Sequence, residues 1–151
     1  MSDRILNPSL AEVSQVPATC MGMHVRRASR IVTQVYDAAL RPVGLGVNQF
    51  MLLSAIHLVG SAQITHLAQE LFTDQTTLTR NLKLLEKRGL IAINPGADRR
   101  VKLVSLTAEG QSLLAQAFPL WEQAQTDVKQ HLGQQNWQTL LSLLSEITTL
   151  G

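Results

Sequence analysis

The chain has 151 residues, of which 45% are hydrophobic, and a formal net charge of +2 at pH 7. That length suits about one domain with its own core, and so small a net charge does not by itself indicate a nucleic-acid partner. A single cysteine excludes an internal disulfide framework and fits a reducing compartment. The N-terminus, with an early acidic residue and a proline, is unlike a signal peptide, and the longest apolar stretch, residues 50–59, is too short to span a bilayer. We therefore expect a cytoplasmic protein.

The first 40 residues are predicted to be an arm followed by a helix. Residues 1–18 contain two prolines, and Asn7-Pro8 suits the start of one short helical turn. From Thr19 to Leu40 apolar residues recur at helical spacing, and Pro42 ends the pattern. The opposite side carries three arginines, which fits a solvated face and, as an alternative, contact with phosphates.

A turn at residues 44–46 leads into a helix from Asn48 to Val59 that is apolar nearly all round. Such a helix is expected to be central and buried. Gly46 is at the N-cap position of this helix, where glycine is acceptable.

Two further helices are predicted over residues 64–71 and 75–88, with Gly89 ending the second. In the second helix Leu78, Leu82 and Leu85 form one buried stripe. The opposite side carries threonines and basic residues, which suit phosphates and base edges. The candidate DNA-contacting residues of this helix are Gln75, Thr76, Thr77, Thr79, Arg80, Asn81 and Lys83.

Beyond Gly89 two β-prone runs, residues 90–93 and 101–106, flank a tip rich in turn residues, which predicts a hairpin. The tip contains Asp98, Arg99 and Arg100, all candidate DNA-contacting residues. Between positions 73 and 102 seven basic residues stand against three acidic ones, a local charge of +4 that exceeds the net charge of the whole chain. Helix, turn, helix and basic hairpin together predict a winged helix-turn-helix that binds DNA.

The C-terminal part is predicted to be two helices. Thr107 opens a long helix that contains Pro119, where we expect a kink, and Gly133 ends it. The last helix runs from about Asn136 and has one apolar face. The apolar residues of these helices need a partner surface to cover them. A second copy of the chain is the simplest partner. The apolar face of the last helix comprises Trp137, Leu140, Leu141, Leu144 and Ile147.

The predicted fold is mainly α with a small β-hairpin wing, in a single domain over residues 1–151. Residues 47–106 form the winged helix-turn-helix lobe, and residues 19–42 and 107–150 form dimerisation helices that flank it.

Several motifs, in this order and spacing, resemble the MarR family of bacterial transcription regulators over roughly Met23 to Leu150. The strongest are Asp98-x-Arg100 and the Leu106-Thr107-x-Glu109-Gly110 that follows it. The others are Gln49-Phe50, Leu67-Ala68, Thr77-Leu78-Thr79-Arg80 and Leu85-Glu86-Lys87-Arg88-Gly89-Leu90. One departure is Gly46, where the family usually has a capping Ser or Thr.

The resemblance implies a homodimeric repressor on a pseudo-palindromic operator. Arg100 would enter the minor groove, with its guanidinium held by Asp98. A small ligand, often a phenolic or other lipophilic anion, would bind between the dimer helices and the lobe and release the DNA. The ligand-binding candidates are His24, Tyr36, Phe50 and His57.

The resemblance also raises a redox alternative. Some relatives sense peroxides through a cysteine near the start of the first helix, supported by a tyrosine at about the position of Tyr36. Cys20 lies some two residues too early in this register, and Arg26 stands in place of the second tyrosine. Cys20 is therefore interpreted as a small apolar residue at a helix start, with a redox switch as the alternative.

An enzyme is the competing class, and its motifs are missing from the sequence. The chain has no Gly-rich phosphate loop, HExxH, CxxC or Gly-x-Ser-x-Gly motif, and its four histidines are far apart. We expect no catalytic residue, metal or cofactor. A winged helix that binds only protein stays open as a third class, although the cationic wing tip argues against it.

Overall fold

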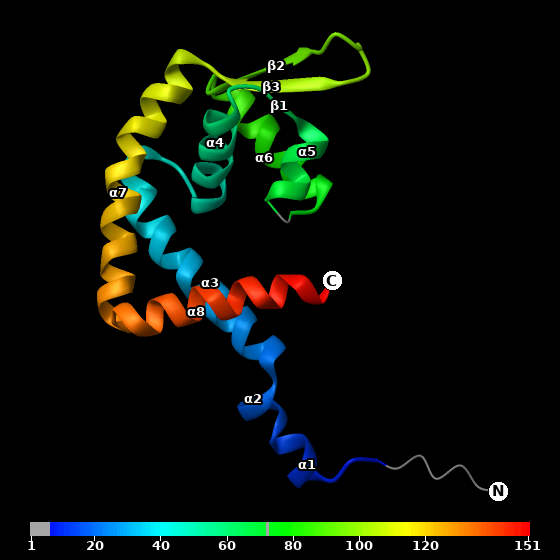
Figure 1. The fold of residues 1–151 in the computed structure, drawn as a ribbon, viewed down its shortest axis with the longest axis vertical. Coiled ribbons are helices and arrows are strands. Elements are labelled where there is room, and N and C mark those ends of the chain that lie inside the picture. The colour runs from blue at the N-terminus through cyan, green and yellow to red at the C-terminus, as the bar shows by residue number, and fades with distance from the viewer. Residues whose placement is uncertain (1–6, 72) are drawn as a thin grey trace, which may run out of the picture. The chain divides into compact units, whose positions relative to one another are not determined.

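The computed structural model describes residues 7–71 and 73–151. The chain divides into two units, Met1–Val35 and Tyr36–Gly151, and the division falls within helix α3 (Met21–Leu40). Figure 1 shows the elements of both units. The single domain predicted from the sequence stays a prediction.

In the first unit the arm contains two short helices, α1 (Leu10–Ser14) and α2 (Val16–Thr19). The cap of α1 is Ser9 rather than the predicted Asn7-Pro8. The Ser9 hydroxyl accepts from the Glu12 N–H at 3.2 Å, and the Glu12 carboxylate accepts from the Ser9 N–H at 2.7 Å. This reciprocal pairing satisfies two N–H groups that lack helical partners, which explains why the helix begins there. The following helix α3 starts two residues later than predicted.

In the second unit a small sheet packs on a helical core (Figure 1). Strands β1 (Ala62–Gln63), β2 (Ile91–Pro95) and β3 (Lys102–Leu106) form an antiparallel sheet in the order β1-β3-β2. The register pairs Ile91 with Leu106 and Pro95 with Lys102, so β2 continues two residues beyond the predicted run. The predicted hairpin is confirmed, and β1 adds a third strand to it.

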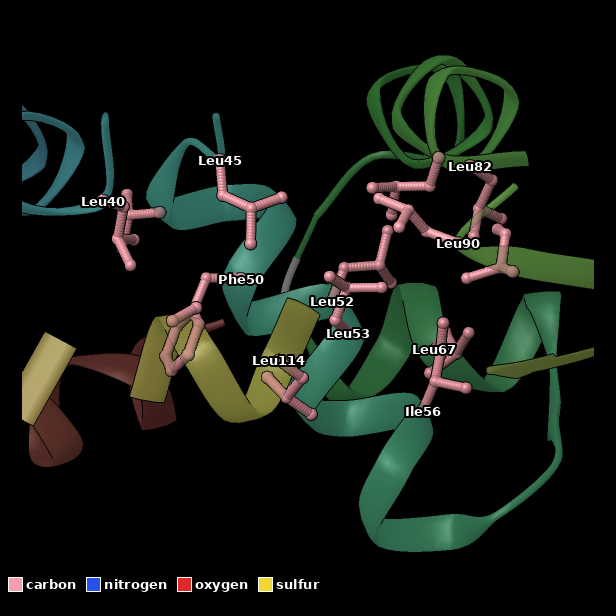
Figure 2. Packing of buried hydrophobic residues seen from close by; sticks show 14 of the residues in the cluster. Leu40, Leu45, Phe50, Leu52, Leu53, Ile56, Leu67, Leu82, Leu90 and Leu114 are labelled. Carbon is pink, nitrogen blue, oxygen red and sulfur yellow. The ribbon is translucent and has the colours of Figure 1, made fainter. Parts of the chain in front are cut away.

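Helix α4 (Val47–Val59) lies at the centre of this core, as predicted. Figure 2 shows its side chains packed against residues from α5 (Ile64–Glu70), α6 (Gln75–Lys87) and α7 (Ala108–Leu132). Leu53 and Ile56 are fully buried, and Phe50 stacks on Trp121 of α7 with ring centroids 5.7 Å apart. The stripe of α6 is confirmed too, because Leu78, Leu82 and Leu85 are all buried.

The N-terminus of α4 receives its cap from another helix. Gly46 has no side chain to offer, and the carboxylate of Asp37 on α3 accepts from the Val47 N–H at 2.7 Å. A Cβ built on Gly46 would lie 3.4 Å from the same carboxylate oxygen. The predicted tolerance of glycine at this position therefore depends on Asp37.

A compact junction joins α6, the wing and α7. The Thr107 hydroxyl donates to the Gly89 carbonyl at 2.6 Å and accepts from the Gly110 N–H at 3.0 Å, so it caps α7 and closes on the end of α6. The Thr107 N–H donates to the Leu90 carbonyl at 3.1 Å. Gly110 faces the same carbonyl so closely that a Cβ on it would lie 1.9 Å from the oxygen. These contacts give a physical reason for Thr107 and Gly110 in the Leu106-Thr107-x-Glu109-Gly110 motif.

The two C-terminal helices differ in how their apolar residues are covered. In α7, which is continuous through Pro119, Leu114, Ala117 and Ala124 are buried in the core of their own unit. Helix α8 (Gln134–Ile147) begins two residues earlier than predicted and has no buried residue. Its large apolar side chains are mostly exposed, with Leu141 and Leu143 at 49% and 51%. The need for a partner surface therefore rests on α8 more than on α7.

Helix α3 has a similar exposed apolar side within the first unit. The residues concerned are Met21, Val25, Ile31, Val32 and Val35. Within residues 7–71 and 73–151 no single helix is long and apolar enough to cross a membrane, and one bent pair, Met21–Val43 with Val47–Val59, passes only by length and composition.

Candidate nucleic-acid interface

The position of α6 is fixed at its first turn by a side-chain cap. The carboxylate of Asp74 accepts from the Thr77 N–H at 2.8 Å and from the Thr77 hydroxyl at 2.7 Å. These hydrogen bonds favour the charged form and hold the pKa of the Asp74 carboxyl below its usual value. The cap satisfies N–H groups that have no partner within the helix.

One face of α6 is exposed and cationic. It lies opposite the buried leucines and carries an open depression of about 640 Å³. The depression is lined by Gln75, Thr76, Thr79, Arg80, Lys83, Leu84 and Lys87. The structure thus places five of the seven helix residues predicted to contact DNA on one surface.

The other two predicted helix residues lie on a flank. Thr77 and Asn81 are half-buried and line a separate depression of about 220 Å³ that faces α4. The Thr77 hydroxyl is already bonded to Asp74. Thr77 therefore supports the cap of the helix rather than its exposed face.

The wing forms two crevices with α6, and its two arginines lie in different ones. Arg100 lines a crevice of about 350 Å³ together with Gln75 and Thr79, near the N-terminal end of α6. Arg99 lines a crevice of about 320 Å³ together with Lys83, farther along the helix. The two arginines therefore flank α6 at different points along its length.

The resemblance implies that Asp98 holds the Arg100 guanidinium. In the structure Asp98 bonds the backbone instead. Its carboxylate accepts from the Arg100 backbone N–H at 3.0 Å, and Val101 N–H donates to the Asp98 carbonyl at 2.9 Å. An aspartate that bonds the backbone two residues on stabilises a turn, so here Asp98 shapes the tip.

The cationic groups of α6 and the wing are free of carboxylate partners. Over the described ranges 7–71 and 73–151 the single ion pair joins His66 and Glu70, at 3.7 Å. Cations without carboxylate partners give a surface a positive potential that attracts polyanions.

Two features of α6 escaped the sequence analysis. The Arg88 guanidinium donates to the Gly44 carbonyl at 2.8 Å and so ties the end of α6 to the turn before α4. Leu84 is 47% exposed on the cationic face. The sequence does contain a sign that one leucine of α6 is exposed: of the adjacent Leu84 and Leu85, only Leu85 fits the spacing of the buried stripe.

Of the four ligand-binding candidates, three belong to the second unit and one to the first. Tyr36 is buried, and its hydroxyl donates to the Gln125 side chain. Burial raises the pKa of the Tyr36 phenol. Phe50 is a core residue, whereas His57 lines a surface depression of about 400 Å³ between α4 and α7. His24 belongs to the first unit, where its Nε2 lies 3.1 Å from the Ala18 carbonyl oxygen.

Cys20 is a half-buried free thiol in the first unit. It lies at the start of α3, where its carbonyl accepts from the His24 N–H at 3.2 Å. Among residues 7–71 and 73–151 there is no group of three or more His, Cys, Asp or Glu side chains arranged to hold a metal ion.

Helices α5 and α6, followed by the β2–β3 hairpin, define a winged helix-turn-helix protein. The model of the MarR family matches residues 43–100. The M. tuberculosis transcriptional regulator MosR, solved in complex with DNA, is 36% identical with a TM-score of 0.76, over 87% of this chain and 98% of that chain. The chain therefore belongs to the MarR family, which is made up of transcription regulators.

Two further relatives agree with this family. The transcriptional repressor CouR, solved bound to a 23-mer DNA duplex, is 27% identical with a TM-score of 0.80, over 94% of this chain and 99% of that chain. The Bacillus subtilis HTH-type transcriptional regulator YhbI is 29% identical over 118 residues, which span 78% of this chain and 77% of that protein.

Proposed function

We propose that this regulator is a homodimeric, cytoplasmic repressor that binds a pseudo-palindromic operator through α6 and the wing. A small-molecule ligand releases it from the DNA. The observation that carries the proposal is the exposed face of α6, where threonines and cations lie opposite a buried leucine stripe.

In this proposal α6 lies in the major groove. The groove is about 12 Å wide and accepts one helix, whose side chains then reach base edges and phosphates. Thr76 and Arg80 lie one turn apart on the exposed face, with Thr79 and Gln75 beside them at the N-terminal end. These residues contact base edges or the adjacent phosphates, and Lys83 contacts phosphate.

The wing contacts the flanking minor groove through Arg100. Its crevice with Gln75 and Thr79 supports this assignment, because a side chain beside the first turns of α6 is near the part of the helix that meets the bases. Arginine in a narrow minor groove responds to the negative potential there. Arg99, which lies beside Lys83, contributes charge toward the phosphate backbone.

A second copy of the chain covers the apolar side chains of α3 and α8. Leu141 and Leu144 of α8 are 49% and 39% exposed, and Ile31 of α3 is 53% exposed. Burying one large apolar side chain completely contributes roughly 1.5–3 kcal/mol, so a handful of them supports a stable dimer. Two copies place two α6 helices on half-sites about one helical turn apart.

The releasing signal is a bound ligand rather than oxidation of Cys20. The chain has one cysteine, so oxidation cannot form a disulfide within one protomer. Mild peroxide tests this choice through operator affinity in the parent and in Cys20→Ser. Reversible loss of binding in the parent that is absent in the serine variant contradicts the ligand proposal.

Selection of bound sequences from a random DNA pool, with the full chain, tests the proposal as a whole. We expect an enriched sequence with inverted symmetry. Arg80→Ala is expected to reduce the ratio of specific to non-specific affinity, by roughly 1–3 kcal/mol if it removes a base contact. Lys83→Ala, the matched control on the same face, is expected to weaken all sequences alike and lower the salt dependence. Enrichment of no sequence would favour a winged helix that binds protein.

A further inference from the structure

Leu84 is an apolar side chain in a cationic setting. Over the described length of α6 it is the one exposed large hydrophobic residue, at 47% of its surface. It shares the depression on the exposed face with Arg80, Lys83 and Lys87. The other residues that line this depression are all polar or charged.

The core does not require a leucine at position 84. Leu85, the next residue, is fully buried and completes the stripe that begins at Leu78. Leu84 follows Arg80 by four residues, so the two side chains neighbour one another on the same face of the helix. A polar residue at position 84 would leave the buried stripe of α6 intact.

The chemistry of the major groove supplies an apolar partner. Thymine is the one base that presents an apolar group there, its C5-methyl, and apolar side chains contact it favourably. Lys83 and Lys87 provide the charge that binds phosphates around this position. Leucine has no hydrogen-bonding group, so it distinguishes bases only by apolar contact.

We propose that Leu84 is a specificity-determining residue that recognises a thymine in each half-site through its C5-methyl group. This inference rests on the proposed function, in which α6 lies in the major groove. It assigns sequence preference to a position of the helix beyond the threonines and Arg80.

Replacing thymine with deoxyuridine tests the proposal, because deoxyuridine lacks only the methyl group. Each thymine of the selected operator is replaced in turn, and affinity for the full chain is measured at constant salt. We expect one thymine per half-site at which the replacement weakens binding about fourfold, the effect of losing one buried methyl group. Replacement in both half-sites together is expected to weaken binding about sixteenfold.

Variants assign the effect to a side chain. In Leu84→Ala the sensitivity at that thymine is expected to disappear, whereas Leu84→Met and the neighbouring Lys83→Ala are expected to keep it. Thr76→Ser and Thr79→Ser remove a methyl group but keep the hydroxyl. They are therefore expected to leave the sensitivity unchanged at the thymine assigned to Leu84.

The outcomes separate this inference from the proposed function. Absence of any enriched DNA contradicts the proposed function itself. Specific DNA binding with no sensitive thymine, or with a sensitive thymine that Leu84→Ala leaves unchanged, overturns the role of Leu84. If the role of Leu84 is overturned in this way, Leu84 contacts sugars without regard to sequence, or it contacts no DNA at all. Because Leu84 is exposed, we expect the Leu84→Ala variant to unfold within about 2 °C of the parent.

Discussion

Replacing Gly110 with alanine tests the junction between the wing and α7. The added Cβ would lie 1.9 Å from the Leu90 carbonyl oxygen and 2.9 Å from the carbonyl carbon. Both atoms belong to the backbone, so no side chain can rotate away to make room. The first distance is more than 1 Å inside the 3.0 Å limit for real Cβ contacts, so either α7 or the wing must shift.

Two opposing effects determine how Gly110→Ala changes the free energy of unfolding. Forcing extra volume into a packed site costs about 1–3 kcal/mol, occasionally more, and the upper end applies where backbone must move. The gain in helix propensity from glycine to alanine is at most about 1 kcal/mol. The shift also strains the Thr107 hydrogen bonds to Leu90 and Gly89. We expect a net loss of about 2–3 kcal/mol in the free energy of unfolding.

Thermal unfolding at a fixed protomer concentration measures this loss, since dimerisation makes the midpoint concentration-dependent. For a chain of this size the expected loss lowers the Tm by roughly 5–10 °C. Gly22→Ala is the matched control, because its Cβ would make an ordinary contact, 3.8 Å from the Cys20 sulfur, in helix α3. A Gly110→Ala variant that unfolds at the parent's temperature would refute the close approach of α7 to Leu90.

Three further predictions concern the wing, the cap of α6 and the last helix. Arg100→Ala is expected to weaken operator binding about tenfold more than Arg99→Ala and to blunt the preference for A·T flanks, and equal losses in a titration would contradict the assignment. The lowered pKa of Asp74 means that its stabilising contribution is present above its unfolded value of 3.8 and is lost as pH falls through the folded pKa. Below about pH 4 the Tm of the parent should therefore fall more steeply than that of Asp74→Asn, which keeps the cap without a titrating group, and parallel slopes would exclude this role. Truncation after Gly133 is expected to abolish the dimer in sedimentation, and a folded truncated dimer would locate the interface elsewhere.

The sequence predicted those parts of the fold that depend on local periodicity and turn chemistry. The buried stripe of α6 and the all-round apolar α4 follow from the spacing of their own residues, and both are confirmed. The wing follows from β-prone runs around a turn-rich tip. The starts of α1 and α8 were misplaced, by about two residues, because helix ends depend on which cap competes best.

The parts that escaped prediction depend on contacts between distant residues. The bond of Arg88 to Gly44 joins positions 44 residues apart, and periodicity contains no sign of it. The pairing of Asp98 with backbone rather than with a guanidinium depends on the shape of the tip. The same holds for Thr77, whose hydroxyl bonds Asp74. The burial of Tyr36 and Phe50 in the core likewise depends on contacts with other helices, and their predicted role in ligand binding stays a prediction.

Because Asp37 of α3 caps the N-terminus of α4, the effect of a substitution at position 37 depends on the residue at position 46. With glycine at 46, the Asp37 carboxylate reaches the Val47 N–H, and loss of that carboxylate alone leaves a helix start without its acceptor. A serine at 46 would supply a cap but would crowd the Asp37 oxygen, 3.4 Å from the new Cβ. The two substitutions should therefore be non-additive, with Asp37→Ala less costly once Gly46→Ser is present. A lineage could exchange one capping arrangement for the other most easily by acquiring the serine first.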